Sequence, residues 1–507
     1  MSEAAGIIER MFEARARLPE SVARLDAVFE RRHPSITQES AALVDRLRAT
    51  RRAENSAAGQ RLAVIGELDA LRLRLLGERE TWCTDTQEAV AAEVAAAMCI
   101  SQALATSYLY YARAMRTRLP LVGALLQAGD VDYRAFQTIV YRTDLIADVE
   151  VMASVDGELA AKAQRWPAMT HSALAAAVDR IVARADLDAV RRRRERQAER
   201  ELSIFDSGNG LTEVFGRLLS PDAHALDARL DALARTVCNA DPRTRNQRRA
   251  DAMAALTVGA DRLGCRCGQP HCPAAGSPLP SPVIIHVVAD QASIEGHGRE
   301  PGSMIGSDAL IPADLIAELA QSAKLRPLIH PNDAAPEPNY VPSQALTDFV
   351  RCRDLTCRFP GCDRPAVRCD VDHTISHADG GPTHASNLKC LCRLHHLIKT
   401  FWGWRDQQLP DGTLIWAAPS GHTYVTTPGS ALLFPQLCTP TGTLDSIAHR
   451  PRRTDHTAMM PKRRRTRAQN RARYVADERR HNRLLRQARR AGIAGREPPG
   501  DYEPPPF

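Results

Sequence analysis

Cysteine and histidine residues gather between Cys357 and Lys399, and this stretch constrains the fold more than any other part of the chain. Cys357 and Cys362 form a C-x4-C pair around a Phe-Pro-Gly turn, and Cys392 and His395 form a C-x2-H pair. These ligand types and loop lengths are typical of a closed tetrahedral zinc site, which stabilises a small fold without a large hydrophobic core. Ordinary buried cysteines are the alternative, but the paired spacing favours zinc.

A short strand is predicted just after the first cysteine pair. Apolar and polar residues alternate from Val367 to Asp372, which is typical of a strand with one face buried. Asp372 then lies at the end of the strand, with Asp370 on the same face as a less favoured carboxylate. Cys369 falls on the inward face, where it is expected to be a small core residue.

A helix is predicted to follow the turn that contains Gly380 and Gly381, with Asn387 as its capping residue. Adjacent helical residues point about 100° apart, so His395 and His396 are expected to serve different ions. His396 and Lys399 are three residues apart and therefore share the helix face turned toward a second site.

The second set of polar residues is suited to hydrolysis of a phosphodiester. Asp372 and His396 can hold a divalent cation, and oxygen ligands from Asp372 and Asn387 favour Mg²⁺ or Mn²⁺ over zinc. The cation polarises the phosphate and neutralises the charge that develops on the leaving oxygen. His373 can accept a proton from the attacking water, because a free imidazole titrates near neutral pH.

These residues resemble the HNH endonuclease motif, whose ββα-metal fold holds one divalent ion against the scissile phosphate. The resemblance implies His373 as general base, Asp372 and His396 as metal ligands, and Asn387 as a metal ligand or as the residue that orients the active loop. Lys399 belongs to the same catalytic group. The structural zinc is then bound by Cys357, Cys362, Cys392 and His395, with a C-x2-H pair where C-x2-C is commoner.

Composition places the chain in a reducing compartment and assigns its basic charge to one end. Thirteen cysteines without an N-terminal apolar run of signal-peptide type indicate a reducing compartment, and no apolar window is long enough for a membrane span. The expected location is the cytoplasm, in association with the nucleoid if DNA is the partner. Residues 450–496 carry 17 Arg and Lys against 3 Asp and Glu. This segment is predicted to contact DNA, although a solvated disordered tail explains it equally. The proposed contacts are Lys462, Arg463, Arg464, Arg465 and Arg467.

Two further segments carry open alternatives. The alanine-rich stretch from Glu88 to Asp130 suits a helix-turn-helix unit, but core packing of a helix pair is the commoner explanation. A second cysteine group precedes a proline-rich segment, and its tight C-x-C spacing leaves a metal site and free thiols equally favoured. Its members are Cys265, Cys267, His271 and Cys272.

Residues 241–252 predict a helix with a dense basic first turn. Cations oppose the dipole at a helix N-terminus, which indicates a nearby anion or carboxylate as their partner.

The order of elements from Glu88 to His330 and the motifs L-C-R-L-H-H-L-I-K-T and W-x-x-P-x-G-x-x-Y resemble the actinobacterial 13E12 repeat family. Such proteins couple a helical domain of unknown function to a C-terminal HNH module. The expected fold is mainly α with small α+β parts, a helical N-terminal domain preceding a ββα-metal HNH module with a zinc knuckle. The expected regions are an N-terminal helical segment (1–85), an α-rich domain with a β-hairpin and short strands (86–330), a Pro-rich linker (331–342), the HNH module (343–437) and a basic, largely disordered tail (438–507).

The sequence therefore predicts a metal-dependent HNH endonuclease that hydrolyses DNA, with Mg²⁺ or Mn²⁺ as catalytic ion and Zn²⁺ as structural ion. The alternative is a catalytically inactive, zinc-containing DNA-binding protein, and RNA is a further possible substrate. The sequence does not define the oligomeric state.

Overall fold

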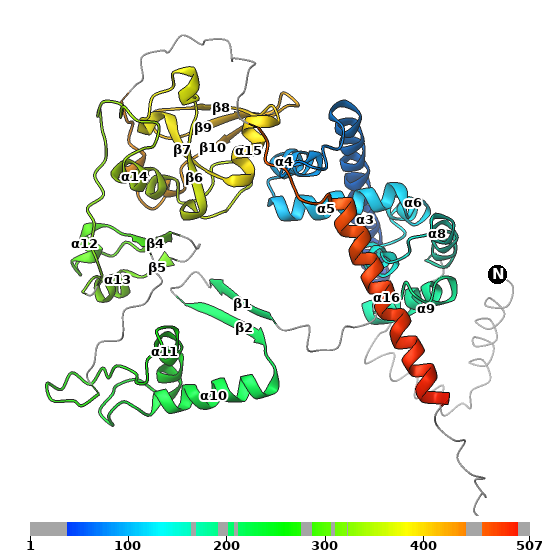
Figure 1. The fold of residues 1–507 in the computed structure, drawn as a ribbon, viewed down its shortest axis with the longest axis horizontal. Coiled ribbons are helices and arrows are strands. Elements are labelled where there is room, and N and C mark those ends of the chain that lie inside the picture. The colour runs from blue at the N-terminus through cyan, green and yellow to red at the C-terminus, as the bar shows by residue number, and fades with distance from the viewer. Residues whose placement is uncertain are drawn as a thin grey trace, which may run out of the picture. The chain divides into compact units, whose positions relative to one another are not determined.

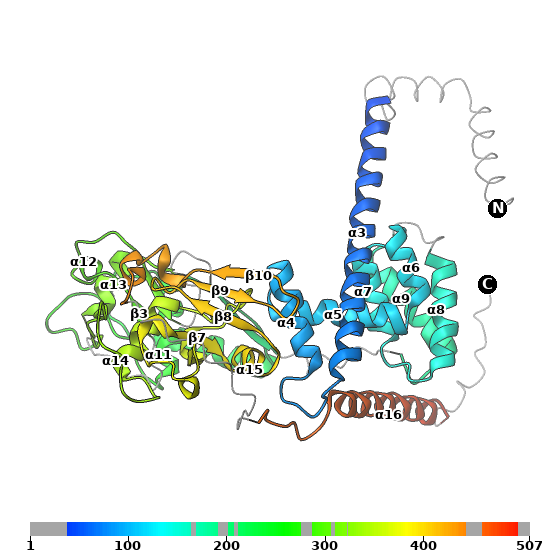
Figure 2. The same ribbon diagram turned by 90° about the horizontal axis from the view of Figure 1, so that it is seen from above.

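The computed structural model describes residues 38–163, 169–190, 201–206, 211–274, 286–305, 310–321, 323–442 and 459–494. Within these ranges the chain is mainly helical, and its strands form small antiparallel sheets of two or three strands (Figure 1 and Figure 2). The predicted class of a mainly helical chain with small strands is confirmed at this level. The beginning of the predicted N-terminal segment, residues 1–37, lies outside the described ranges.

The chain divides into two compact units, each assembled from segments that are distant in sequence. The first unit contains residues 1–67, 110–190 and 479–507, and the second contains residues 68–109 and 191–478. The linear boundaries expected from composition do not coincide with this division, because the composition of a segment does not report which distant segment it packs against.

The first unit consists of helices joined by short loops, and its described residues contain no strand. Asp156 is buried, and its carboxylate accepts the backbone N–H groups of Leu121 (2.9 Å) and Val122 (3.1 Å) at the start of a helix whose first residue is Pro120. It thereby satisfies two donors that have no partner within the helix. The helices that contribute to this unit are α3 (Gln38–Leu76), α5 (Gln102–Thr117), α6 (Pro120–Ala128), α7 (Tyr133–Thr143), α8 (Val149–Ala163), α9 (His171–Ala185) and α16 (Arg467–Ala494).

The second unit contains the strands. Its two-stranded sheets are β1 (Glu201–Asp206) with β2 (Thr212–Arg217), as the hairpin pattern predicts, and β6 (Cys369–His373) with β7 (Leu388–Cys392). Its three-stranded sheets are β3 (His286–Val288), β4 (Gly302–Ile305) and β5 (Leu310–Ile311), and β8 (Arg405–Gln408), β9 (Leu414–Ala417) and β10 (Thr423–Thr426). Its complete helices are α4 (Thr86–Met98), α10 (Ser220–Ala234), α11 (Arg245–Thr257), α12 (Gln291–Ile294), α13 (Ala313–Ala320), α14 (Gln344–Asp354) and α15 (Arg393–Phe401).

The alanine-rich helix α4 is a core element of the second unit. Asp85 caps its N-terminus, and Ala89, Ala92 and Ala96 are buried in one hydrophobic cluster with aromatic residues of the C-terminal segment such as Phe349. Small side chains allow this close approach. The packing explanation therefore fits α4, most of whose residues are buried. The second helix of the stretch, α5, has exposed residues such as Leu104 and Ser107, so the helix-turn-helix alternative stays a prediction.

Strand β7 was not predicted, and its presence corrects the expected position of the following helix. Every residue of β7 is buried, so the strand lacks the alternation that identified β6. Asn387 precedes β7 and does not cap α15; the N-cap of α15 is Cys392. The order here is thus strand, strand, helix, with Asp372 opposite Lys389 in the antiparallel register.

The tail after residue 438 is more ordered than predicted, since it contains the 28-residue helix α16. Within the first unit, Arg479 pairs with Asp186 at 2.5 Å and Arg483 with Asp188 at 3.2 Å. The amide of Asn482 is buried and donates to the carbonyl groups of Asp188 and Val190. Residues 443–458 and 495–507 of the predicted tail lie outside the described ranges.

Candidate metal centre

The four predicted zinc ligands come together in the second unit. The ligand atoms of Cys357, Cys362, Cys392 and His395 all lie within 4.8 Å of one another. His395 Nδ1 is 3.3 Å from Cys392 Sγ and 3.6 Å from Cys357 Sγ. Tetrahedral zinc with bonds of 2.0–2.3 Å separates its ligands by roughly 3.5–3.8 Å, so this donor set fits such an ion. The imidazole is fixed by stacking on Phe359, with ring centroids 4.0 Å apart.

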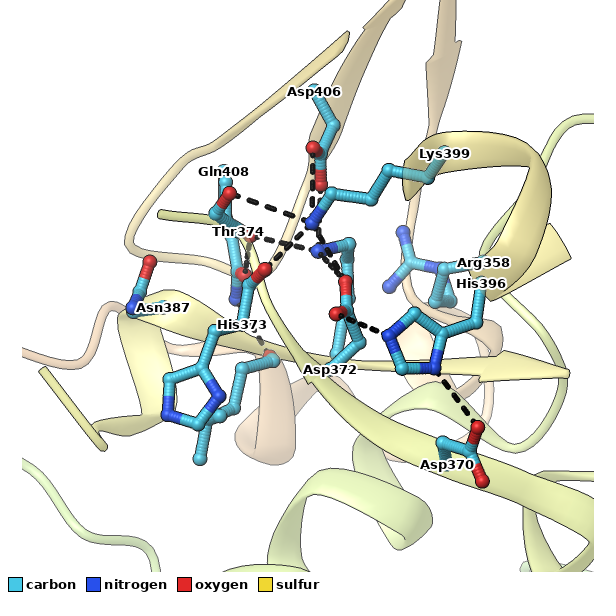
Figure 3. Close-up of polar contacts among 12 residues, drawn as sticks. Arg358, Asp370, Asp372, His373, Thr374, Asn387, His396, Lys399, Asp406 and Gln408 are labelled. Atoms are coloured by element: carbon cyan, nitrogen blue, oxygen red, sulfur yellow. Dashed lines mark hydrogen bonds and ion pairs between the residues drawn. The ribbon is translucent and has the colours of Figure 1, made fainter. Parts of the chain in front are cut away.

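The adjacent histidine, His396, faces a different group of residues, as predicted. Its Nε2 is 3.2 Å from Asp372 Oδ1, and its Nδ1 is 2.9 Å from Asp370 Oδ2 (Figure 3). Asp370 and Asp372 lie on the same face of β6 because strand residues two apart point the same way. The side chains of His396 and Asp370 are 26% and 44% exposed, so solvent and ions reach this side of the pair.

The other oxygen of Asp372 is held by two buried lysines. Asp372 Oδ2 accepts hydrogen bonds from Lys389 Nζ (2.8 Å) and Lys399 Nζ (2.7 Å), and both ammonium groups also pair with Asp406. Burial opposes ionisation of Asp372, but these cations and His396 hold its pKa well below the ordinary value. Asp372 is thus ionised at neutral pH, with Oδ1 directed toward His396.

Lys389 and Asp406 were missed by the sequence analysis. Burial opposes the charged form of Lys389, yet Asp372 and Asp406 raise its pKa above the ordinary value. A lysine in the apolar run L-K-C-L-C was the available signal, because a fully buried lysine must be paired with an acid. Asp406 carried no comparable signal, since it lies outside the motif.

His373 does not join Asp372 and His396. Its ring points away from the Asp372 carboxylate (Figure 3), as expected for neighbours on a strand. His373 Nε2 lies 3.0 Å from Thr383 Oγ1, and the ring stacks on Tyr340 at a centroid distance of 5.3 Å. The residue is only 6% exposed, and burial lowers its pKa to about 4. The imidazole is therefore neutral at neutral pH, although the same shift makes it a weaker base than a free imidazole.

Asn387 organises the loop between β6 and β7. Its Oδ1 accepts the Ile375 N–H at 2.8 Å, and its Nδ2 donates to the carbonyl oxygens of Ile375 (3.0 Å) and Pro382 (2.8 Å). A Cβ atom at Gly381 would lie 1.9 Å from the Ile375 oxygen, so this loop requires glycine there. Since its amide is engaged in this way, Asn387 has the geometry of the predicted loop-orienting residue and not that of a metal ligand.

The second predicted cysteine group has a different membership from the one expected. Cys265, Cys267 and Cys272 gather with Cys238, and His271 is exposed and lies outside the cluster. Cys238 is 27 residues from Cys265, so only the packing of two helices shows that it belongs to the group.

The predicted basic contacts separate into two classes. Arg463 pairs with Asp85 at 2.8 Å, and Arg467 pairs with Asp85 at 2.5 Å and also with Glu88. These two side chains therefore fasten residues 459–467 to the start of α4. Lys462, Arg464 and Arg465 are exposed and remain the predicted nucleic-acid contacts.

Over the ranges that the structure describes, no single helix combines the length and apolar character needed to cross a membrane. The helices Thr86–Met98 and Gln102–Thr117 meet that requirement only as a pair, bent by 111°.

Comparison with known proteins identifies the family. A family model described as "Domain of unknown function (DUF222)" matches residues 49–354, and the chain belongs to this family. Two relatives from Mycobacterium tuberculosis H37Rv are similar along almost their whole length. "Uncharacterized protein Rv3776" is 43% identical over 471 residues, covering 87% of this chain and 90% of its own. "Uncharacterized protein Rv2100" is 40% identical over 522 residues, covering 94% of both chains. No solved structure matches the chain.

Proposed function

We propose that the protein is a metal-dependent HNH endonuclease that hydrolyses DNA phosphodiester bonds. The DUF222 domain is associated with HNH modules in actinobacteria, and the family match ends at residue 354, just before the cysteine and histidine stretch. The order β6, β7, α15 is the order of a ββα-metal module. A ββα-metal module after the DUF222 domain would be the architecture of the 13E12 repeat family that the motifs resemble.

The observation that carries the proposal is the pair formed by Asp372 and His396. Two adjacent ligands of an octahedral cation with bonds of about 2.1 Å lie about 3 Å apart, and Asp372 Oδ1 and His396 Nε2 are 3.2 Å apart. Asp370 accepts from Nδ1, which leaves the lone pair of Nε2 directed at the same space. The carboxylate oxygen suits Mg²⁺ or Mn²⁺, and the imidazole nitrogen favours a transition ion such as Mn²⁺ over Mg²⁺.

Each remaining residue receives a role from its contacts. The bound cation would polarise the phosphate and neutralise charge on the leaving oxygen. His373 is the general base because its imidazole is neutral, and Asn387 holds the loop that positions it. Lys399 fixes the Asp372 carboxylate and also donates to the His373 carbonyl oxygen at 2.6 Å. Cys357, Cys362, Cys392 and His395 would hold the structural Zn²⁺, which would join the start of α15 to the preceding knuckle.

A second candidate function, DNA binding without cleavage, rests on the position of His373. Its ring is buried under Tyr340 and directed away from Asp372, so in this conformation the base is separated from the proposed cation site. In that case the zinc module and the exposed arginines would serve DNA binding alone.

A plasmid-nicking assay with Mg²⁺ or Mn²⁺ separates the two candidates. We expect wild-type protein to nick supercoiled DNA, and His396→Ala and His373→Ala to lose at least about 100-fold of the rate, because one removes a metal ligand and the other the base. His422→Ala is the matched control, since His422 is an exposed histidine of the same segment that contacts Ser420.

Three outcomes are informative. Loss in both site variants with a normal His422→Ala rate supports the endonuclease. DNA binding by a folded wild-type protein that shows no nicking with either cation favours the second candidate. Equal nicking rates for wild type and His373→Ala would exclude His373 as the general base. A parallel assay on single-stranded RNA shows whether the protein cleaves RNA as well as DNA.

A further inference from the structure

The helical hairpin formed by α10 and α11 has too small a core to be stable by itself. The core contains six buried residues, and four of them are alanines or valines. The members are Leu233, Val237, Ala252, Ala255, Ala260 and Leu263. Segments this short usually require a metal, a disulfide or a partner to supply the missing stability. An additional interaction is therefore needed to stabilise the packing of α10 against α11.

Four cysteines meet at the point where the two helices end. Cys238 follows α10, and Cys265, Cys267 and Cys272 follow α11; their sulfur atoms all lie within 4.8 Å of one another. Cys238 Sγ and Cys265 Sγ are 3.5 Å apart, much longer than the roughly 2.05 Å of a disulfide. Sulfur atoms around a tetrahedral ion with bonds of about 2.3 Å are separated by about 3.8 Å, so the cluster has the size of a zinc site.

A buried ion pair fixes the two cysteine-bearing loops against each other. Arg243 donates to Asp241 at 2.7 Å and to the Gly264 carbonyl oxygen at 2.7 Å, and the Arg266 N–H donates to Asp241 at 3.0 Å. The Asp241 side chain is fully buried, so this network joins the loop after Cys238 to the loop of Cys265. The sequence predicted a nearby anion or carboxylate for the basic residues at the start of α11. The structure supplies carboxylates: Asp241 for Arg243 and Asp231 for Arg249.

We propose that Cys238, Cys265, Cys267 and Cys272 bind a second structural zinc ion, which closes the α10–α11 hairpin. Four thiolates saturate the ion and leave no position for water, so the site has a structural and not a catalytic role. The proposal does not depend on nuclease activity, because the cluster shares no residue with Asp372 or His396.

Metal analysis of the full chain tests the proposal directly. The wild-type protein should carry two zinc ions, one for each cluster. Cys238→Ser and Cys267→Ser should each reduce the content to one, and so should Cys357→Ser at the other cluster. His271→Ala and the exposed-cysteine control Cys83→Ser should keep two. Circular dichroism of each variant checks that the helices persist.

Cobalt substitution provides a second measurement, in which the absorption spectrum reports the ligand set of each cluster. Four-thiolate cobalt absorbs at longer wavelength than the three-sulfur, one-nitrogen set of the other cluster, so two superimposed spectra are expected, and Cys357→Ser should leave only the four-sulfur spectrum. The proposal would be overturned if the wild-type protein contained one zinc ion and Cys357→Ser contained none. Loss of a zinc ion in His271→Ala would also overturn it. So would mass spectrometry that finds Cys238, Cys265, Cys267 and Cys272 joined in two disulfides.

Discussion

At the scale of single residues, the candidate site depends on a carboxylate that lies beside the predicted ligands. Asp370 accepts a hydrogen bond from His396 Nδ1 and thereby sets which imidazole nitrogen faces Asp372. Residues that orient a metal ligand in this way commonly affect metal affinity or activity almost as much as the ligand itself. Asp370 is therefore more important than its position in the strand pattern suggested.

Replacing Asp370 tests this orienting role. Asp370→Asn keeps the shape but removes the charge that stabilises the Nδ1–H form, so we expect metal affinity and nicking to fall by about 10- to 100-fold. Asp379→Asn, in the loop between the strands, serves as the control. Higher Mn²⁺ concentration should recover much of the Asp370→Asn activity; an unchanged metal dependence would contradict an orienting role.

The low pKa of His373 predicts an unusual acid limit for activity. A general base works when unprotonated, and a pKa of about 4 keeps it so down to about pH 5. Because Tyr340 contributes to the burial of the ring, Tyr340→Ala should raise this pKa toward 6.5, and the acid limb of the nicking rate should move to higher pH. An NMR titration of the His373 ring with and without Tyr340 measures the shift independently. Identical titration curves would show that Tyr340 does not shield the base.

At the scale of elements, the cysteine pairs and the strand β6 were predictable because both are local patterns. Spacing within one loop identified Cys357 and Cys362, and alternation identified β6. Strand β7 has no alternation because both of its faces are buried. Cys238 was out of reach for a related reason, since its partners come from another segment and local sequence does not record them. Lys389 could have been suspected from its place in an apolar run, but its acidic partner Asp406 could not be named from local sequence.

Strand β7 is fixed in place by a buried triad of charged residues, Arg353, Asp354 and Arg358. Asp354 Oδ1 pairs with both arginines, and its Oδ2 accepts the Cys390 N–H of β7 at 2.8 Å. Burial opposes ionisation of Asp354, but the two guanidinium groups keep its pKa below the ordinary value. Arg353 also donates to the carbonyl oxygens of Ala385 and Leu388, which places the start of β7.

The two classes of tail arginine should behave differently when replaced. Arg464→Ala with Arg465→Ala should weaken DNA binding and lower the slope of log K against log salt by about 2, roughly one for each lost phosphate contact. Fluorescence anisotropy at several salt concentrations measures the slope, with Arg405→Ala as an exposed control on β8. Arg463→Ala should instead lower the melting temperature, because it breaks the pair with Asp85. An unaltered slope in the double variant would exclude these two arginines as phosphate contacts.

At the scale of the whole molecule, both cysteine clusters lie in the second unit. A structural zinc contributes on the order of 10 kcal/mol to folding, which is comparable to the whole stability of a domain. The two units should therefore respond differently to loss of metal.

Chelation should separate the two units in a thermal scan. With EDTA we expect the transition of the second unit to disappear or fall by well over 10 °C, while that of the first unit stays in place. Asp156→Ala identifies the first transition, since it removes the buried carboxylate of α8 that accepts two backbone N–H groups at the start of α6, and it should lower that melting temperature by a few degrees. Zinc-saturated EDTA is the control, and equal movement of both transitions would contradict the assignment of the metals.

The docking of residues 459–467 on the start of α4 has a consequence for biosynthesis. Asp85 emerges from the ribosome long before its partners Arg463 and Arg467, and Asp186 likewise emerges long before its partner Arg479. Each unit therefore completes these contacts only after its last segment has been made. A chain truncated before Arg463 would lack the partners of both Asp85 and Asp186, and both units would be incomplete.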